Sequence, residues 1–266
     1  MDHYTVIGNP VKHSRSPAMH ARFAELAGDN ISYDRTLAPL DGFTDTMNRL
    51  AAEGYKGANV TVPFKEEAYR WASQLTARAK QAGAVNTLAL QKDSSWLGDN
   101  TDGAGLVADL KRLGAALRGS NILVIGAGGA TRGILGPLVE EAPASLVVAN
   151  RTESKAEQLA ALFNISAHSF ADLAGQRFDI IINATAASLS DELPPVTSSI
   201  FDGASLAYDL VYKPAGTVFE QWAKAHGCHA SSDGLGMLVA QGAESFSLWR
   251  QRQPNWQQVL NEMKEG

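Results

Sequence analysis

Short apolar runs alternate with segments of helical periodicity along almost the whole chain. A run of four to eight β-formers predicts a buried strand, and apolar residues three and four positions apart predict an amphipathic helix. Strands and helices in regular alternation are typical of βαβ units built on a parallel sheet. The pattern therefore predicts an α/β fold.

The first hundred residues have this pattern, with polar residues where the strands end. Ser16 and Pro17 have the residue types of a helix N-cap and a first helical position. Further helices are expected over 40–52 and from Asp102 to about Leu113. The strands are expected at 4–8, 31–37, 57–62, 85–90 and 96–97, the last two as a hairpin.

A second series of strands and helices follows. Strands are expected at 121–125, 145–150, 178–183 and 205–211, with helices from about 129 and over 153–163. A surface loop is expected at 191–199, and closing helices near 235–250 and 255–264. We therefore expect two domains, 1–102 with 236–266 and 103–235, with a cleft between them where a small molecule could bind.

Composition narrows the class of protein. The 266 residues carry a formal net charge of −5, which argues against a nucleic-acid partner. A single cysteine, Cys228, allows no internal disulfide or cysteine-rich metal site, and no metal is expected. The chain shows no secretion signal and no apolar run that could span a membrane, so a cytoplasmic protein without a membrane partner is expected.

The run from Ile122 to Gly133 has the order that a dinucleotide pyrophosphate requires. Four β-formers lead into the turn Gly126-Ala127-Gly128-Gly129-Ala130, and a helix-forming stretch follows. Glycines allow close backbone approach, and a helix N-terminus favours an anion. Thr131 replaces the third glycine of the usual fingerprint, and a glycine-rich turn alone could be only a tight strand-to-helix connection.

The end of the next strand indicates which cofactor is used. Chains that use NAD usually carry an acid there for the ribose 2′-hydroxyl, whereas this strand ends in Asn150 and Arg151. A guanidinium suits the 2′-phosphate of NADP. Because the whole chain is acidic, local cations such as Arg132, Arg151 and Lys155 must attract an anionic cofactor. The sequence predicts NADP.

Hydroxyl, amide, amine and carboxyl groups gather at strand ends in the first hundred residues. Alternation places Asn59 and Thr61 on one face of their strand. Each group also has a structural interpretation, as a turn residue, a helix cap or an exposed first-turn lysine. Together they suit a small polyhydroxylated acid, with a lysine–aspartate pair to manage a proton. The residues concerned are Ser14, Ser16, Asn59, Thr61, Lys65, Asn86, Thr87 and Asp102.

Several longer motifs make the chain resemble the shikimate dehydrogenase family over nearly its whole length. They are Gly8-Asn9-Pro10 with Ser14-Arg15-Ser16-Pro17, Asn59-Val60-Thr61-Val62-Pro63-Phe64-Lys65, Gly83-Ala84-Val85-Asn86-Thr87, Gly98-Asp99-Asn100-Thr101-Asp102-Gly103, Gly126-Ala127-Gly128-Gly129-Ala130, Asn150-Arg151-Thr152, Asn183-Ala184-Thr185, and Asp233-Gly234-Leu235-Gly236-Met237-Leu238 ending at Gln241. The resemblance implies a substrate domain followed by a Rossmann-like NADP domain.

The resemblance also implies roles for single residues. Ser14 and Ser16 would bind the shikimate carboxylate, and Tyr212 would lie beside the substrate. Ring hydroxyls would be held by Asn59, Thr61, Asn86, Asp102 and Gln241. NADP would be bound by Gly126, Ala127, Gly128, Gly129, Ala130, Asn150, Arg151, Thr152, Lys155, Leu210 and Gly234. Ala77 departs from the family, which often has an acid between residues such as Thr76 and Arg78.

The implied reaction is reversible, NADPH-dependent reduction of 3-dehydroshikimate to shikimate, in the pathway to chorismate and the aromatic amino acids. Lys65 would accept the hydroxyl proton with Asp102, or act as an oriented cation beside the developing alkoxide. Three alternatives remain open: a quinate/shikimate paralogue that tolerates NAD, a non-catalytic NADP-binding regulator, and a lysine-dependent dehydrogenase acting on a folate. A monomer or a homodimer is expected.

Overall fold

The computed structural model describes residues 1–265 and forms two compact units. The first unit is Met1–Gly105 with the chain from Val239 onward, and the second is Leu106–Leu238. These borders lie three residues beyond the expected ones at 102/103 and 235/236. Each unit has its own six-stranded sheet.

The sheet of the first unit has the strand order β2-β1-β3-β5-β6-β4. β5 runs antiparallel to both of its neighbours, and the other pairs are parallel. The strands are β1 (Asp2–Gly8), β2 (Ile31–Leu37), β3 (Gly57–Val60), β4 (Gln74–Leu75), β5 (Thr87–Leu90) and β6 (Trp96–Asp99). Because β1 and β3 are parallel, the loops that follow them leave from the same edge of the sheet.

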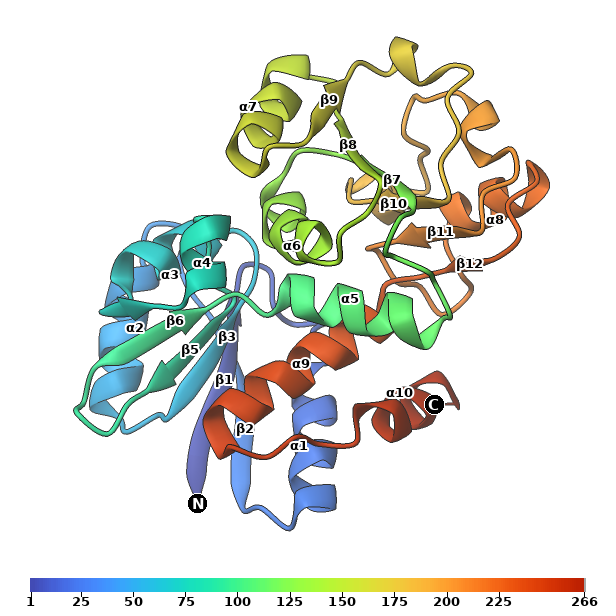
Figure 1. Cartoon of the computed structure of the whole chain (residues 1–266). Helices are drawn as coiled ribbons and strands as arrows, with labels where there is room; N and C mark the ends of the chain where they lie inside the picture. The colour runs from blue at the N-terminus through green and yellow to red at the C-terminus, as the bar shows by residue number, and fades with distance from the viewer. Residues whose placement is uncertain (266) are drawn as a thin grey trace. The chain divides into compact units, whose positions relative to one another are not determined.

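Helices cover both faces of this sheet, as Figure 1 shows. α2 (Phe43–Ala52), α3 (Lys65–Trp71) and α4 (Ala77–Ala82) share one core with Ile7, Val60 and Leu88. On the other face, Val6 and Tyr33 pack with Trp249. The helices on that face are α1 (Ser16–Ala27), α9 (Leu235–Arg250) and α10 (Trp256–Glu265).

The sheet of the second unit is parallel throughout and has the order β12-β11-β10-β7-β8-β9. Read from β9, this is the Rossmann order 3-2-1-4-5-6. The strands are β7 (Asn121–Ile125), β8 (Ser145–Ala149), β9 (Ser166–His168), β10 (Ile180–Asn183), β11 (Leu206–Asp209) and β12 (Ser231–Ser232). The order reverses between β7 and β10, which is where such sheets bind nucleotides.

Apolar side chains from both faces of this sheet form two cores. One core includes residues of α5 (Asp102–Arg112), α6 (Gly129–Glu140) and α7 (Glu153–Phe163). The other includes Phe219 of α8 (Val218–Ala225) and Phe201 of η3 (Ser198–Phe201). Two further 3₁₀ turns are η1 (Ala171–Leu173) and η2 (Ala187–Ser190). A strand that is covered on both faces has a continuous run of apolar residues. β7 has this run at 122–125 and β8 at 146–149.

The α/β class is confirmed, and the longer elements lie within a few residues of their expected bounds. The strand expected at 57–62 ends at Val60, and the helix expected at 40–52 starts at Phe43. The loop expected at 191–199 ends two residues earlier, because η3 begins at Ser198. Sequence analysis missed α3, α4, α8, β4, β9 and β12, which have two to eight residues each. Segments this short carry too few turns or alternations for periodicity to identify them.

Candidate active site

The first unit brings four of the expected site residues together. Lys65 is the first residue of α3, Asn86 immediately precedes β5, Asp102 opens α5, and Gln241 lies on α9. Four separate elements therefore supply one polar cluster. Its members are joined by the hydrogen bonds described next.

Lys65 and Asp102 form an ion pair. Lys65 Nζ lies 2.5 Å from Asp102 Oδ2, and the lysine and aspartate side chains are 21% and 8% exposed. Asn86 Nδ2 donates to the other oxygen, Asp102 Oδ1, at 2.8 Å. Both carboxylate oxygens are thus engaged, so the carboxylate is fixed. An ammonium has three donors, and the one bond to Asp102 orients it while leaving capacity for a ligand.

Asn86 is the centre of this cluster. Its Nδ2 also donates to Thr101 Oγ1 at 2.8 Å and to Gln241 Oε1 at 3.2 Å. Its Oδ1 accepts from the backbone N–H of Thr101 at 2.8 Å. The side chain is 2% exposed. Asn86 therefore fixes the segment before α5, and with it the position of Asp102.

A close helix crossing places Gln241 beside this segment. A Cβ added to Gly105 of α5 would lie 2.6 Å from both Cβ and the backbone N of Gln241. A Cβ atom essentially never lies that close to another non-bonded atom, so α5 and α9 reach this separation because position 105 is glycine. The Gly105 contact thus allows the amide of Gln241 to meet Asn86.

Asn59 lies beneath the cluster, with its amide fully engaged. Asn59 Oδ1 accepts from Tyr33 Oη at 2.7 Å, and Nδ2 donates to Ser245 Oγ at 2.9 Å and to Thr87 Oγ1 at 3.2 Å. The residue is 6% exposed. In this arrangement Asn59 orders the hydroxyl groups under Asn86, while its expected contact with a ring hydroxyl stays a prediction.

A second layer of polar residues lies beneath Asn86; Thr87 was among the expected polar groups, whereas Thr101 and Ser245 were given no role from the sequence. Thr87, Thr101 and Ser245 share hydrogen bonds beneath Asn86, the Thr87–Ser245 oxygens being 2.7 Å apart. Thr101 and Thr87 lie inside motifs of the family resemblance. Threonine is also common in turns, so the residue type alone does not distinguish a buried network hydroxyl from a turn hydroxyl. Ser245 follows Gln241 by one helical turn, and that spacing was the available signal.

Arg78 and Thr76 form a second missed group around Asp99. Arg78 binds both carboxylate oxygens, at 2.7 Å through Nε and 2.5 Å through Nη2, and Thr76 Oγ1 donates at 2.6 Å. Burial raises the pKa of Asp99, but the bonds from Arg78 outweigh it and hold that pKa below its ordinary value. Ala77, the departure from the family, lies between these two donors.

Ser14 lies in the loop between β1 and α1, and Ser16 is the first residue of α1, whose N-cap is Arg15 and not the expected Ser16. The backbone N–H of Ser16 donates to Ser14 Oγ at 3.2 Å, and the N–H of Ser14 donates to the carbonyl of Val11 at 3.1 Å. Ser16 is 6% exposed, whereas Ser14 is partly exposed. Thr61, partly exposed, follows β3, and its backbone N–H donates to the carbonyl of Ile7 at 2.9 Å. The loops after β1 and β3 are joined by the N–H of Asn9, which donates to the carbonyl of Val62 at 3.0 Å.

The glycine turn of the second unit fits a pyrophosphate. Gly126 has φ +113°, and an added Cβ would lie 3.1 Å from the backbone carbon of Ala184. At Gly128 and Gly129 an added Cβ would meet nothing within 4 Å, so the backbone borders open space where α6 begins. Thr131 is fully buried and its hydroxyl donates to the carbonyl of Gly126 at 3.0 Å. The threonine therefore stabilises the turn in place of the third glycine.

The segment after β8 fits a phosphate on the ribose. Arg151, Thr152 and Lys155 are exposed, and Asn150 Nδ2 donates to the carbonyl of Thr152 at 2.9 Å. Within residues 1–265, no carboxylate forms an ion pair with Arg151 or Lys155, so their charge is available to a ligand. This donor set suits the 2′-phosphate of NADP.

Two further cofactor positions meet at the end of β11. A Cβ on Gly234 would lie 2.2 Å from the carbonyl oxygen of Leu210, and the Gly234 N–H donates to Val211 at 3.1 Å. Asp209, just before Leu210, is fully buried, and burial raises the pKa of its carboxyl group. Ser188 Oγ donates to it at 2.5 Å. Tyr212, expected beside the substrate, is partly buried in the same segment.

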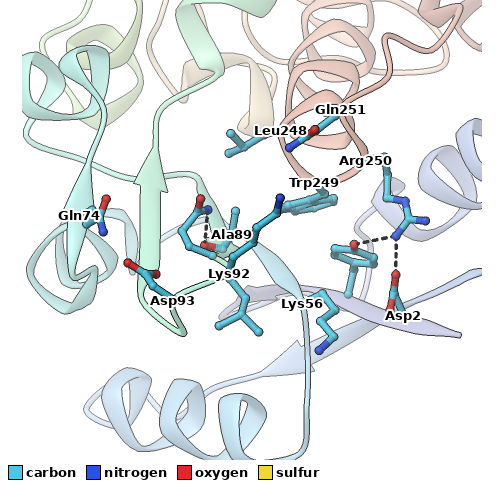
Figure 2. Close-up of a pocket in the computed structure, with 13 residues that line it drawn as sticks. Asp2, Lys56, Gln74, Ala89, Lys92, Asp93, Leu248, Trp249, Arg250 and Gln251 are labelled. Atoms are coloured by element: carbon cyan, nitrogen blue, oxygen red, sulfur yellow. Dashed lines mark hydrogen bonds and ion pairs between the residues drawn. The ribbon is translucent and has the colours of Figure 1, made fainter.

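A separate hollow of about 590 Å³ lies at the opposite end of the first sheet (Figure 2). Asp2 and Tyr4 line it from the start of β1, and Trp249 and Arg250 from the end of α9. None of the expected site residues lines it. The Lys65 cluster instead belongs to the edge where β1 and β3 end. The hollow is therefore not the candidate active site.

The part of the chain that the structure describes has neither a metal-ligating cluster nor a membrane-spanning helix. In residues 1–265, no group of three or more His, Cys, Asp or Glu side chains has an arrangement that could hold a metal ion. Over the same range, every helix is too short or too polar to cross a membrane.

Known proteins and family models match this chain over most of its length. Three family models match: the shikimate dehydrogenase substrate binding domain over residues 6–88, shikimate / quinate 5-dehydrogenase over 109–190, and the shikimate 5′-dehydrogenase C-terminal domain over 234–264. The chain is 51% identical over 270 residues to shikimate dehydrogenase (NADP(+)) of Vibrio cholerae serotype O1, covering 100% of this chain and 97% of the relative.

Two solved structures share the fold over nearly the whole chain. An Ael1 enzyme from Pseudomonas putida has a TM-score of 0.95 at 39% identity, covering 98% of both chains. Shikimate 5-dehydrogenase from Thermus thermophilus, solved in complex with NADP(H) and shikimate, has a TM-score of 0.91 at 33% identity, covering 100% of this chain and 99% of that one.

Proposed function

The chain belongs to the shikimate dehydrogenase family, and on that premise we propose that it catalyses the reversible NADPH-dependent reduction of 3-dehydroshikimate to shikimate. This reaction belongs to the shikimate pathway, which leads to chorismate and the aromatic amino acids. The observation that carries the proposal is the Lys65–Asp102 ion pair, fixed by Asn86 and lying in the unit that matches the substrate-binding model.

Lys65 manages the proton in this proposal. In the direction of reduction, its ammonium donates a proton to the carbonyl oxygen of the substrate as that oxygen becomes a hydroxyl. The positive charge stabilises the negative charge that develops on the oxygen beforehand. In the opposite direction the amine accepts the hydroxyl proton. Asp102 holds the lysine side chain in place for both.

The remaining polar residues orient the substrate. Ser14 and Ser16 bind the ring carboxylate, and the amides of Asn86 and Gln241 bind ring hydroxyls, with Asn59, Thr61 and Tyr212 supporting the ring. Amides can both donate to and accept from a hydroxyl, which suits a polyol. The assignment is supported by the hydrogen bond that places Gln241 beside Asn86.

NADP, when bound, supplies the hydride or accepts it. The turn Gly126–Ala130 would hold its pyrophosphate, because the backbone there borders open space at the start of α6. Asn150, Arg151, Thr152 and Lys155 would hold the 2′-phosphate, and Leu210 and Gly234 would complete the cofactor site. These features support the assignment of residues 103–235 to NADP and of 1–102 with 236–266 to the substrate.

A direct assay tests the proposal. Purified protein should form NADPH, followed by its near-ultraviolet absorbance, when shikimate and NADP are supplied together. NAD in place of NADP should lower kcat/KM strongly, and so should quinate in place of shikimate, which separates this activity from that of a quinate/shikimate paralogue. Absence of any turnover of shikimate with either cofactor would refute the proposal.

We place the enzyme in the cytoplasm as a monomer or a homodimer. The single cysteine agrees with a reducing compartment. Light scattering of the purified protein distinguishes the two oligomeric states.

A further inference from the structure

Arg35 of β2 reaches the loop that carries Ser14 and Ser16. Its Nη2 donates to the carbonyl oxygen of Ser14 at 2.6 Å, and its Nε donates to the same oxygen at 3.1 Å. Two donors on one acceptor fix both the guanidinium and the peptide group that joins Ser14 to Arg15. Sequence analysis gave Arg35 no role, and it lies outside every motif that carries the family resemblance.

The sheet register explains how Arg35 arrives there. Val6 of β1 pairs with Arg35 on one side and with Asn59 on the other. Residues paired across parallel strands project to the same face of a sheet. Arg35 therefore shares a face with Asn59, on the side of the sheet where α1 begins. The loop that carries Ser14 lies beside this face, within reach of the Arg35 guanidinium.

The charge of Arg35 is not neutralised by a neighbouring acid. In residues 1–265 it forms no ion pair with a carboxylate, and its hydrogen bonds go to a neutral carbonyl. The adjacent Asp34 alternates to the other face of β2, where the Tyr55 hydroxyl donates to it at 3.3 Å. Lys12 and Arg15 lie on either side of Ser14 in the same loop, and residues 9–15 include no acid. The loop thus carries an excess of positive charge.

A local cation matters because the chain as a whole has a formal net charge of −5. A carboxylate substrate approaches against that field, whereas a neutral polyol does not. A guanidinium that donates to the Ser14 carbonyl also polarises the peptide and strengthens the Arg15 N–H as a donor. Both effects favour a negative group at the Ser14–Ser16 loop.

We propose that Arg35 is a positioning and specificity-determining residue that makes the site select acidic substrates over neutral ring polyols. It acts through the Ser14 carbonyl and through its field, not by contact with the reacting atoms. The inference rests on the proposed function, because it takes the Ser14–Ser16 loop as the carboxylate site. It extends that function by naming the residue outside the loop that supplies the charge.

Arg35→Gln and Arg35→Lys separate charge from hydrogen bonding. Glutamine keeps one amide donor for the Ser14 carbonyl and loses the charge, whereas lysine keeps the charge. Lys92→Gln removes one positive charge at the opposite end of the same sheet and is the matched control. Thermal unfolding of each variant checks that it is folded.

The substrates are shikimate and its neutral methyl ester, the ester measured also as a competitive inhibitor. In Arg35→Gln, kcat/KM for shikimate should fall about three- to fivefold, as expected for an exposed charge, with kcat nearly unchanged. The inhibition constant of the ester should change less than about twofold. The decrease of kcat/KM with rising salt should become shallower. Arg35→Lys and Lys92→Gln should behave like the wild type.

Two results would overturn the inference. One is an Arg35→Gln variant that keeps the wild-type preference for acid over ester and the wild-type salt dependence. The other is equal loss for acid and ester, which would assign Arg35 a purely structural role in the loop. Failure of the proposed function is distinguishable from both, because the wild type would then not oxidise shikimate with either cofactor.

Discussion

The Lys65 ammonium has donors left for a ligand, because its hydrogen bond to Asp102 uses only one of the three. Asp102 takes one donor at 2.5 Å, and Asn86 holds the other oxygen of that carboxylate. Removing the lysine leaves the carboxylate with its amide partner and leaves the polar floor beneath Asn86 intact. Binding and proton transfer can therefore be separated by one substitution.

Lys65→Ala should lower kcat at least about 1000-fold, near the upper range for loss of a proton-transfer group. The dissociation constant of shikimate should rise less than about tenfold, because the hydroxyl and amide groups that bind the ring remain. Steady-state kinetics and equilibrium titration measure the two quantities. Lys80→Ala, on exposed α4 of the same unit, should be unaffected in both. Near-normal turnover in Lys65→Ala would remove the lysine from the mechanism.

The sequence predicted those site residues whose types are unusual in a turn or at a helix start. Lys65 and Asp102 stood out because a helix start disfavours a lysine, and because an acid close by could pair with it. Thr101 and Ser245 did not, since a buried hydroxyl and a turn hydroxyl look alike in sequence. Their role depends on Asn59 and Asn86 meeting them in space, which no local pattern encodes.

At the scale of elements, two adjacent strand ends divide the work of holding NADP. The turn after β7 offers backbone groups beside open space, and the segment after β8 offers side-chain cations. In the proposed binding mode the first feature would serve NAD and NADP alike, whereas the second would meet only the 2′-phosphate of NADP. A change in the second should therefore affect one cofactor and not the other.

Arg151→Gln should raise KM for NADP about tenfold or more while changing KM for NAD less than about twofold, because a charge-assisted bond to phosphate is lost. Initial rates with each cofactor measure both. Arg118→Gln, an exposed arginine of the same unit, is the control for net charge. A parallel rise in both KM values would show that Arg151 contacts a part shared by the two cofactors.

The crossing of α5 and α9 makes a prediction about stability. In Gly105→Ala the new methyl group would overlap Gln241, whose Cβ and backbone N lie 2.6 Å away. Overpacking of this kind costs about 1–3 kcal/mol, so urea unfolding should show a loss of that size. Gly129→Ala, where an added Cβ meets nothing within 4 Å, should leave the free energy of unfolding unchanged or higher. Equal stability of both variants would contradict the close crossing.

Prediction of the fold succeeded where an element is long or fully buried. β7 and β8 are apolar after their first residue, and α7 has a clear helical stripe, so each was expected almost at its observed bounds. β12 has only two serines, and its place in the sheet comes from pairing with β11. Tertiary pairing of that kind overrides local propensity and cannot be read from a dipeptide.

At the scale of the whole molecule, each unit is held by its own cores, so acid can destabilise one without the other. The first unit contains His20, which is fully buried and stacks on Tyr33 with ring centroids 4.3 Å apart. Neither of its ring nitrogens has a hydrogen-bond partner among the described residues. Burial lowers the pKa of His20 from 6.5 to about 3. Phe23, Phe246 and Trp249 surround it, and none of them can neutralise a charge.

The pKa of His20 predicts how the stability of the first unit depends on pH. The folded pKa of about 3 lies below the unfolded value of 6.5, so between these the unfolded chain binds more protons. The stabilisation is complete above pH 6.5 and is lost as the pH falls toward 3. His20→Phe keeps the ring stack without the titration, so it should abolish about 2.5 kcal/mol of the loss between neutral pH and about pH 4.5. Urea unfolding followed by tryptophan fluorescence reports chiefly on this unit, which holds Trp71, Trp96, Trp249 and Trp256.

The control is His13→Gln, at an exposed position, which should retain the full loss of stability at acid pH. An unchanged pH slope in His20→Phe would show that other groups cause this loss.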